Sequence, residues 1–190
     1  MKKFISLLVL ALAPAMLVQA APATTKSGTT AKKTTATKVD YHPTLHKALN
    51  GHLTRAKGKI DYEGLRKKKY LFLYFSASWC GPCKKFTPQL IDFYEKNTKN
   101  DDFEVILVSS DRTQKAMTAY MKENKMPWPG LRLTSRSTKD LQKKFGGKGI
   151  PCLVLLDEKD KVLAHSYQDG EYVGPNNALR KYKSLHSNQP

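Results

Sequence analysis

The chain has 190 residues, with 33 lysine and arginine residues against 16 aspartate and glutamate residues, and its formal net charge is +17 at pH 7. This excess of positive charge favours anionic partners. The sequence contains no nucleic-acid recognition motif, and we therefore predict no binding to nucleic acid. Beyond the first 38 residues about 150 remain, which is enough for one hydrophobic core.

The first twenty residues have the pattern of a secretory signal peptide. Two lysines precede an apolar run from Phe4 to Ala13, and Val18 and Ala20 occupy the positions that a signal peptidase recognises. The run is too short for a stable membrane span, although an uncleaved anchor is the alternative. We expect residues 1–20 to be removed by cleavage after Ala20 and the mature protein to be periplasmic or secreted.

Residues 21–38 contain seven threonines, four lysines and no acidic residue. Such a segment has almost nothing to bury and cannot offset the entropy lost on ordering. We interpret it as a flexible spacer, with a basic arm that holds the protein on an anionic surface as the alternative. Residues 39–190 are then the folded domain.

The first part of this domain, residues 39–69, has weak patterns. They predict short strands near His52–Leu53 and Lys59–Ile60 and a turn of helix at Tyr62–Arg66. The run from Tyr70 to Ser78 is almost continuously apolar and aromatic, which is typical of a central strand buried on both faces.

A helix is expected from about Gly81 to Lys96, since apolar residues recur there at helical spacing. Residues 103–110 predict a second buried strand. Asp111, followed by Gln114, resembles a capping box and predicts the start of the next helix. The two prolines of KMPWPG must end that helix.

The last third of the chain predicts a helix from Thr138 to Phe145, capped by Ser137, and then a hairpin across the turn at residues 157–160. A final helix carries an apolar stripe that includes Leu179. Parallel strands joined by helices, followed by an antiparallel pair, predict an α/β fold with a central mixed sheet and helices on both faces.

Two of the three cysteines, Cys80 and Cys83, lie C-x-x-C apart in the segment WCGPC. A bridge enclosing two residues constrains the unfolded chain very little, so it would be a poor structural staple. The alternatives are a redox pair and a zinc or copper(I) site that also uses Cys152. The five histidines lack ligand spacing to these cysteines, and we predict no bound metal or other cofactor.

The segment YLFLYFSASWCGPCKKFTPQLIDFYE, together with VILVSSD, YMKENKMPWPGL and GIPCLVLLD, resembles the tryparedoxin and nucleoredoxin branch of the thioredoxin superfamily. The resemblance covers roughly residues 50–168 and implies a thioredoxin-like fold. Gly81 and Pro82 between the cysteines follow ordinary thioredoxins, whereas this branch often has another dipeptide. Ordinary thioredoxins have a buried aspartate where this chain has Tyr74, so the proton acceptor for the buried cysteine must differ.

Cys80 is expected at a helix N-terminus, where free N–H groups and the helix dipole favour a thiolate and lower the thiol pKa below about 8.5. It would be the nucleophile. Cys83, one turn later, would be buried and would resolve the mixed disulfide. Gly81 and Pro82 would let the turn close tightly.

The resemblance also implies a peptide-binding edge. Ile150–Pro151 is the predicted cis peptide, and the backbone of Ile150 would pair with an incoming polypeptide by strand addition. Trp79 and Trp128 could line the same groove, although core packing is an alternative for Trp128. Asp111 could assist proton transfer instead of capping a helix.

Cys152 stays open between a small buried hydrophobic residue, a third redox thiol and a metal ligand. We expect an exported, monomeric thiol–disulfide oxidoreductase that reduces disulfides in exported proteins. Its electrons would come from an unidentified dithiol donor, which could be membrane-bound. A dithiol oxidase or isomerase, an envelope metal-handling protein and a basic-arm anchor are the alternatives.

Overall fold

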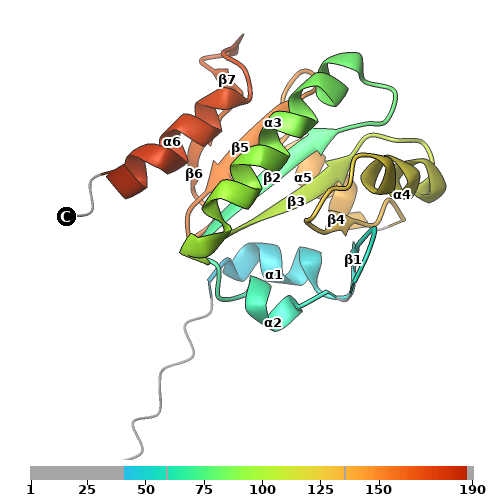
Figure 1. Ribbon diagram of the computed structural model, residues 1–190, viewed down its shortest axis with the longest axis horizontal. Coiled ribbons are helices and arrows are strands. Elements are labelled where there is room, and N and C mark those ends of the chain that lie inside the picture. The colour runs from blue at the N-terminus through green and yellow to red at the C-terminus, as the bar shows by residue number, and fades with distance from the viewer. Residues whose placement is uncertain (1–40, 59, 135, 188–190) are drawn as a thin grey trace, which may run out of the picture. The chain divides into compact units, whose positions relative to one another are not determined.

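A computed structural model describes residues 41–58, 60–134 and 136–187 (Figure 1). The predicted signal peptide and spacer lie outside these residues. The helices of the described domain are α1 (Pro43–Leu49), α2 (Tyr62–Leu65), α3 (Gly81–Asn97), α4 (Gln114–Glu123), α5 (Arg136–Phe145) and α6 (Asn176–Ser187), with a 3₁₀ turn at Thr98–Asn100. In the part of the chain that the structure describes, none of the helices has the length and apolar character needed to cross a membrane.

A six-stranded mixed sheet forms the centre of the domain, in the order β1-β4-β3-β2-β5-β6. The strands are β1 (Leu53–Thr54), β2 (Tyr70–Ser76), β3 (Phe103–Ser109), β4 (Gly130–Leu131), β5 (Cys152–Leu156) and β6 (Val162–His165), and β7 (Tyr167–Gln168) pairs with β8 (Glu171–Tyr172) in a separate hairpin. The two central strands, β2 and β3, are parallel, whereas β5 runs antiparallel to β2. The predicted mixed sheet is therefore confirmed.

Alternate residues of each central strand face opposite layers of helices (Figure 1). Phe72 and Tyr74 point into the layer that contains α3, α4 and α6. Leu71, Leu73 and Phe75 point into the layer that contains α1, α2 and α5. Strands buried on both sides need apolar residues at every position, which explains the continuous apolar run of β2. The prediction of helices on both faces is confirmed.

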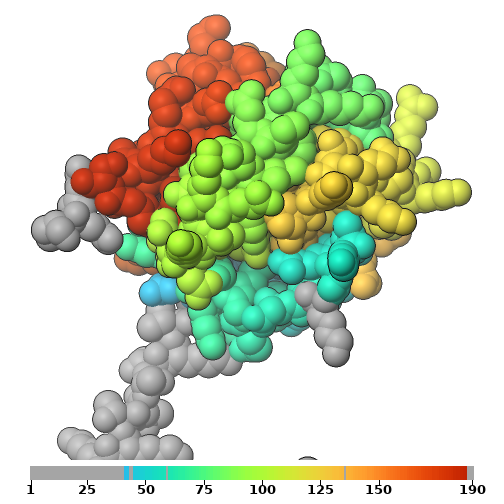
Figure 2. Space-filling view, viewed as in Figure 1, coloured from blue at the N-terminus to red at the C-terminus, as the bar shows by residue number. Residues whose placement is uncertain are grey.

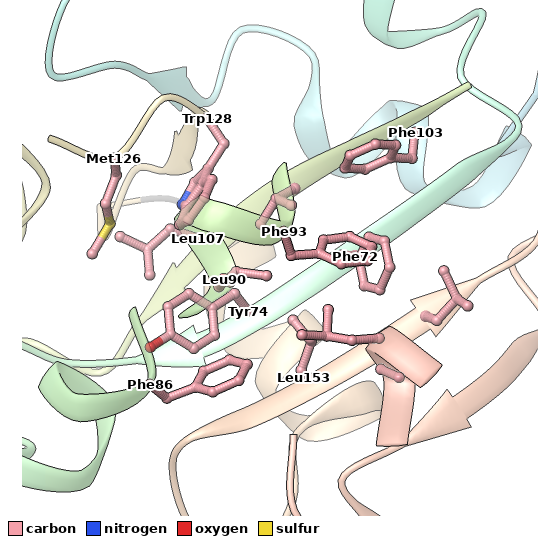
Figure 3. Close-up of a cluster of buried hydrophobic side chains, with 14 of the residues drawn as sticks. Phe72, Tyr74, Phe86, Leu90, Phe93, Phe103, Leu107, Met126, Trp128 and Leu153 are labelled. Carbon is pink, nitrogen blue, oxygen red and sulfur yellow. The ribbon is translucent and has the colours of Figure 1, made fainter. Parts of the chain in front are cut away.

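The layer that contains α3, α4 and α6 is rich in aromatic rings. Phe72 meets Phe93 and Phe103 edge to face, Phe93 and Phe103 are tilted against each other, and all three pairs of ring centroids are 5.7–5.8 Å apart (Figure 3). Such contacts add about 0.5–1.5 kcal/mol per pair beyond the area they bury. Figure 2 shows α6, in red, lying on the surface next to α3, in green. This packing fixes α3, and thereby the cysteine pair at its start.

Several local predictions were wrong. Residues 43–49 form a helix that the sequence patterns did not indicate, and Ile60 belongs to no strand. Thr113, not Asp111, caps α4, because its hydroxyl accepts the Ala116 N–H at 3.1 Å. Helix α5 begins at residue 136, so Ser137 lies inside it and is not its cap. The β7–β8 hairpin was also missed, since two-residue strands leave no periodic pattern.

Candidate active site

The cysteine pair lies where β2 ends and α3 begins. Cys80 is the N-cap residue of α3, Cys83 lies in its first turn, and the two form a disulfide with Cα atoms 5.2 Å apart. The Cys80 residue is 5% exposed and Cys83 is fully buried. An attacking partner can therefore reach only Cys80. This asymmetry agrees with a nucleophilic Cys80 and a resolving Cys83.

Backbone groups surround the Cys80 sulfur. The Cys83 N–H donates to Cys80 Sγ at 3.1 Å, and the carbonyl oxygen of Ile150 lies 3.7 Å from the same sulfur. A free N–H at a helix start, added to the helix dipole, stabilises negative charge on a reduced sulfur. Pro82 fits the first turn because its missing N–H would have no partner there. A Cβ on Gly81 would meet nothing within 4 Å, so sterics do not require glycine at this position.

The Ile150–Pro151 peptide bond is cis, as predicted. Ile150 packs against Ala77, Cys80 and Cys83 and closes the site on the side of β5. Its backbone therefore lies directly beside the disulfide. This is the place where a polypeptide could add as a strand.

Asp111 stabilises the segment that leads into Cys80. Its Oδ1 accepts the Ser78 N–H at 3.0 Å and the Ser78 hydroxyl at 2.6 Å, and its Oδ2 accepts the Ser109 hydroxyl at 2.8 Å. The carboxylate thus ties the end of β3 to the Ser78–Trp79 turn. Asp111 therefore lies beside the segment that carries the cysteine pair and is not the cap of α4; its role as a support of the redox site stays a prediction.

The two tryptophans have opposite environments. Trp79 is 64% exposed, and its indole N–H lies 3.4 Å from the Ser110 carbonyl oxygen. Trp128 is fully buried, with its ring packed against Tyr74 and Tyr94, as Figure 3 shows for Tyr74. A buried indole cannot line a surface groove, so the prediction of Trp128 as a substrate-binding residue is wrong. The exposed Trp79 remains available to line such a groove.

Behind Cys83 lies a buried network of hydroxyl groups. The Thr87 hydroxyl donates to the Cys83 carbonyl at 2.9 Å and is bonded to the hydroxyls of Tyr74 and Tyr120, each at 2.9 Å. Tyr120 also bonds Ser76 at 3.0 Å. Burial raises the pKa of Tyr74, so its hydroxyl stays protonated and cannot act as a base at neutral pH. Tyr74 supports the site by holding the backbone of α3.

Sequence patterns could have revealed only part of this network. Thr87 is four residues after Cys83, so helical spacing alone places both on one face of α3. Ser76 and Tyr120 carry no local signal that links them to the site. Their contribution follows from the packing of α4 against the sheet.

Cys152 is separated from the redox pair by the sheet. It is fully buried, belongs to the layer of α1, α2 and α5, and lies 3.7 Å from His165 Nε2. Burial raises the pKa of this thiol to about 11, so it stays protonated at neutral pH. Within the described ranges, no group of three histidine, cysteine or acidic side chains could hold a metal ion. The structure therefore places Cys152 as a small buried residue.

A surface cavity of about 410 Å³ adjoins the site. Ile150 and Asp111 border it on the side of the disulfide, and Arg112 and Lys139 add positive charge. It is large enough for one or two side chains of a bound polypeptide.

Comparison with known proteins places these features in a family. A thioredoxin-like family model matches residues 68–162, which is half of the chain. The chain belongs to the thioredoxin-like family. Its relatives place it in the tryparedoxin and nucleoredoxin branch, as the sequence resemblance indicated.

Two curated relatives illustrate this likeness. The tryparedoxin of Trypanosoma brucei brucei is 47% identical over 90 residues, which cover 47% of this chain and 61% of that protein. Probable nucleoredoxin 1 of Arabidopsis thaliana is 37% identical over 126 residues, which cover 65% of this chain and 21% of that protein. This chain thus spans less than two thirds of the length of either relative.

Solved structures agree with the fold. Native tryparedoxin I from Crithidia fasciculata is 33% identical with a TM-score of 0.58, and the match covers 76% of this chain and 94% of that one. A thioredoxin from Wuchereria bancrofti is 32% identical with a TM-score of 0.56 and covers 70% and 94% of the two chains. The thioredoxin fold predicted from the sequence is confirmed.

Proposed function

We propose that this protein is an exported, monomeric thiol–disulfide oxidoreductase that reduces disulfides in other exported proteins. The observation that carries the proposal is the Cys80–Cys83 pair at the start of α3, in which Cys80 retains a small exposed area and Cys83 is fully buried. Membership of the thioredoxin-like family supports the same chemistry. The signal-like sequence of residues 1–20 supports export.

The reaction starts from the reduced pair. The Cys80 thiolate attacks one sulfur of a substrate disulfide, forms a mixed disulfide and releases the other substrate sulfur as a thiolate, which takes up a proton. Cys83 then loses its proton and attacks Cys80 Sγ. The mixed disulfide breaks, the second substrate sulfur leaves reduced, and the enzyme holds the Cys80–Cys83 bond. Two electrons have moved from the enzyme to the substrate.

A dithiol donor must return two electrons to close the cycle. The donor attacks the Cys80–Cys83 bond, becomes oxidised to a disulfide and regenerates both enzyme thiols. A membrane protein with an external dithiol would suit an exported enzyme.

Turnover of a polypeptide disulfide tests the proposal. The mature protein, starting at residue 21, should reduce insulin with dithiothreitol as donor at a rate well above that of dithiothreitol alone. The Cys83→Ser variant, reduced and then freed of dithiothreitol, should accumulate a mixed disulfide between Cys80 and insulin, visible by non-reducing electrophoresis. Absence of both turnover and the trapped species would contradict the proposal.

The reduction potential decides the direction of electron flow. A value near about −270 mV would identify a reductase, and one near about −120 mV would identify an oxidant that donates its disulfide. Fractionation of cells, with mass measurement of the N-terminus, tests export and cleavage after Ala20. Recovery of the full-length chain in the cytosolic fraction would contradict export.

A further inference from the structure

The β7–β8 hairpin lies at the same end of the domain as the start of α3 (Figure 1). The Tyr172 hydroxyl on this hairpin donates to the carbonyl oxygen of Pro151 at 2.9 Å. Pro151 is the cis proline, and the preceding carbonyl, that of Ile150, lies 3.7 Å from Cys80 Sγ. One hydrogen bond therefore connects the hairpin to the peptide next to the redox sulfur.

The rest of the hairpin packs directly on the loop before Pro151. A Cβ added to Gly147 would come within 2.1 Å of the Tyr167 ring, so this ring lies against bare backbone. Lys148 Nζ lies 3.4 Å from the Gly170 carbonyl oxygen. The rings of Tyr167 and Tyr172 have centroids 5.1 Å apart. These contacts cover the loop over several consecutive residues.

The base of the hairpin is also anchored. The Tyr167 N–H donates to His165 Nδ1 at 2.9 Å, and His165 Nε2 donates to the Phe145 carbonyl at 2.9 Å. The Val173 N–H closes the other end of the hairpin on the Ser166 carbonyl at 2.9 Å. The hairpin is thus attached to β6 and to the end of α5.

We propose that Tyr172 is a positioning residue for polypeptide substrates, whose hydroxyl holds the cis-proline loop so that the Ile150 backbone can pair with a bound chain. This inference rests on the proposed function, because it assumes reduction of polypeptide disulfides by strand addition at Ile150. Pro151 has no N–H, so its carbonyl is the only polar backbone group that can orient this residue. Partial burial raises the pKa of Tyr172, which keeps its hydroxyl protonated as a donor.

The position of Tyr172 suits contact with a substrate. The residue is 50% exposed although its hydroxyl is engaged with Pro151. Its ring can therefore border a bound chain on the hairpin side, with Trp79 exposed next to Cys80. A disulfide without a peptide backbone cannot use this edge, so Tyr172 should affect only polypeptide substrates.

The experiment compares Tyr172→Phe with Tyr62→Phe in the mature protein. Tyr62 is a matched control, since its hydroxyl also donates to a backbone carbonyl, that of His46, at 2.9 Å. The substrates are insulin and bis(2-hydroxyethyl) disulfide, which has no peptide backbone. In Tyr172→Phe we expect the KM for insulin to rise about two- to tenfold, the effect of one lost hydrogen bond, with kcat and the small-disulfide rate unchanged. Tyr62→Phe should change neither KM.

Three results would overturn the inference. An unchanged KM for insulin in Tyr172→Phe would show that the hydroxyl does not position substrate. Equal losses for both substrates, with a lowered unfolding temperature, would show a merely structural role. The carbonyl ¹³C resonance of Pro151 should shift in Tyr172→Phe but not in Tyr62→Phe, and its constancy would show that the hydrogen bond is absent. Failure of the proposed function is distinct, since the unmodified protein would then reduce neither substrate.

Discussion

The surroundings of Cys80 and Cys152 differ in how well they would stabilise a thiolate. Both residues are buried, with 5% and 0% of their surface exposed. Cys80 lies at a helix start and accepts the Cys83 N–H, whereas Cys152 lies in a strand among apolar side chains. Burial alone therefore does not decide reactivity. Position relative to a helix does, because the N–H groups and dipole at the start of α3 stabilise a thiolate, whereas at Cys152 the effect of burial on the thiol pKa outweighs that of the hydrogen bonds from Gly147 and Ser166.

The largest expected effect is the difference in insulin turnover between variants that replace each of these cysteines. Cys80→Ser removes the nucleophile, so insulin reduction should fall at least about a thousandfold, as for other enzymes that lose a covalent nucleophile. Cys152→Ser is the matched control and should keep the rate within about twofold, since its side chain faces the other layer. Turnover with dithiothreitol as donor measures both. A large loss in Cys152→Ser would show that the third cysteine takes part.

Asp111→Asn should produce the next largest effect. An amide presents a donor where both carboxylate oxygens now accept hydrogen bonds from Ser78 and Ser109. One buried donor then faces another, which should lower the free energy of unfolding by about 1–3 kcal/mol. Urea denaturation measures this loss. Asp92→Asn, at an exposed ion pair with Lys96, is the control and should cost less than about 0.5 kcal/mol. Equal effects would show that Asp111 is not a positioning residue.

Tyr74→Phe tests the hydroxyl network behind Cys83. The variant loses the hydrogen bonds of the Tyr74 hydroxyl to Thr87, at 2.9 Å, and to the Cys83 carbonyl, at 3.3 Å, but Thr87 still donates to that carbonyl. We expect the free energy of unfolding to fall by about 1 kcal/mol, with insulin turnover within twofold of the original. Denaturation and turnover on the same sample measure both. A loss of turnover above tenfold would instead indicate a direct role for Tyr74 in proton transfer.

The smallest expected effect is the pH dependence of the stability that Cys152 contributes. Burial raises its pKa from 9.0 to about 11, so the folded protein keeps this proton where the unfolded chain has lost it. The contribution of Cys152 to stability is complete below about pH 9 and decreases as the pH rises toward about 11. Iodoacetamide should therefore modify Cys152 slowly in the folded, reduced protein at pH 8, while it modifies Cys80. Mass spectrometry measures the two rates, and equal rates would contradict this assignment.

The sequence predicted the elements that depend on local patterns. β2, α3, β3, the β5–β6 hairpin and α6 were placed within a few residues, because each carries its own apolar periodicity. The start of α4 was misplaced, since Asp111 and Thr113 are both good capping residues. Only the tertiary partners of Asp111 decide between them.

The sequence by itself predicted the position of the C-x-x-C pair at a helix start, because this depends on a few consecutive residues, and its resemblance to a known family predicted the cis peptide at residue 151. The tertiary structure decided that Trp128 is core, that Cys152 faces away from the redox pair and that Tyr172 reaches Pro151. A tryptophan or cysteine is compatible with either face of a sheet, and packing between distant segments chooses the face. A hydrogen bond across 21 residues leaves no mark on the local sequence.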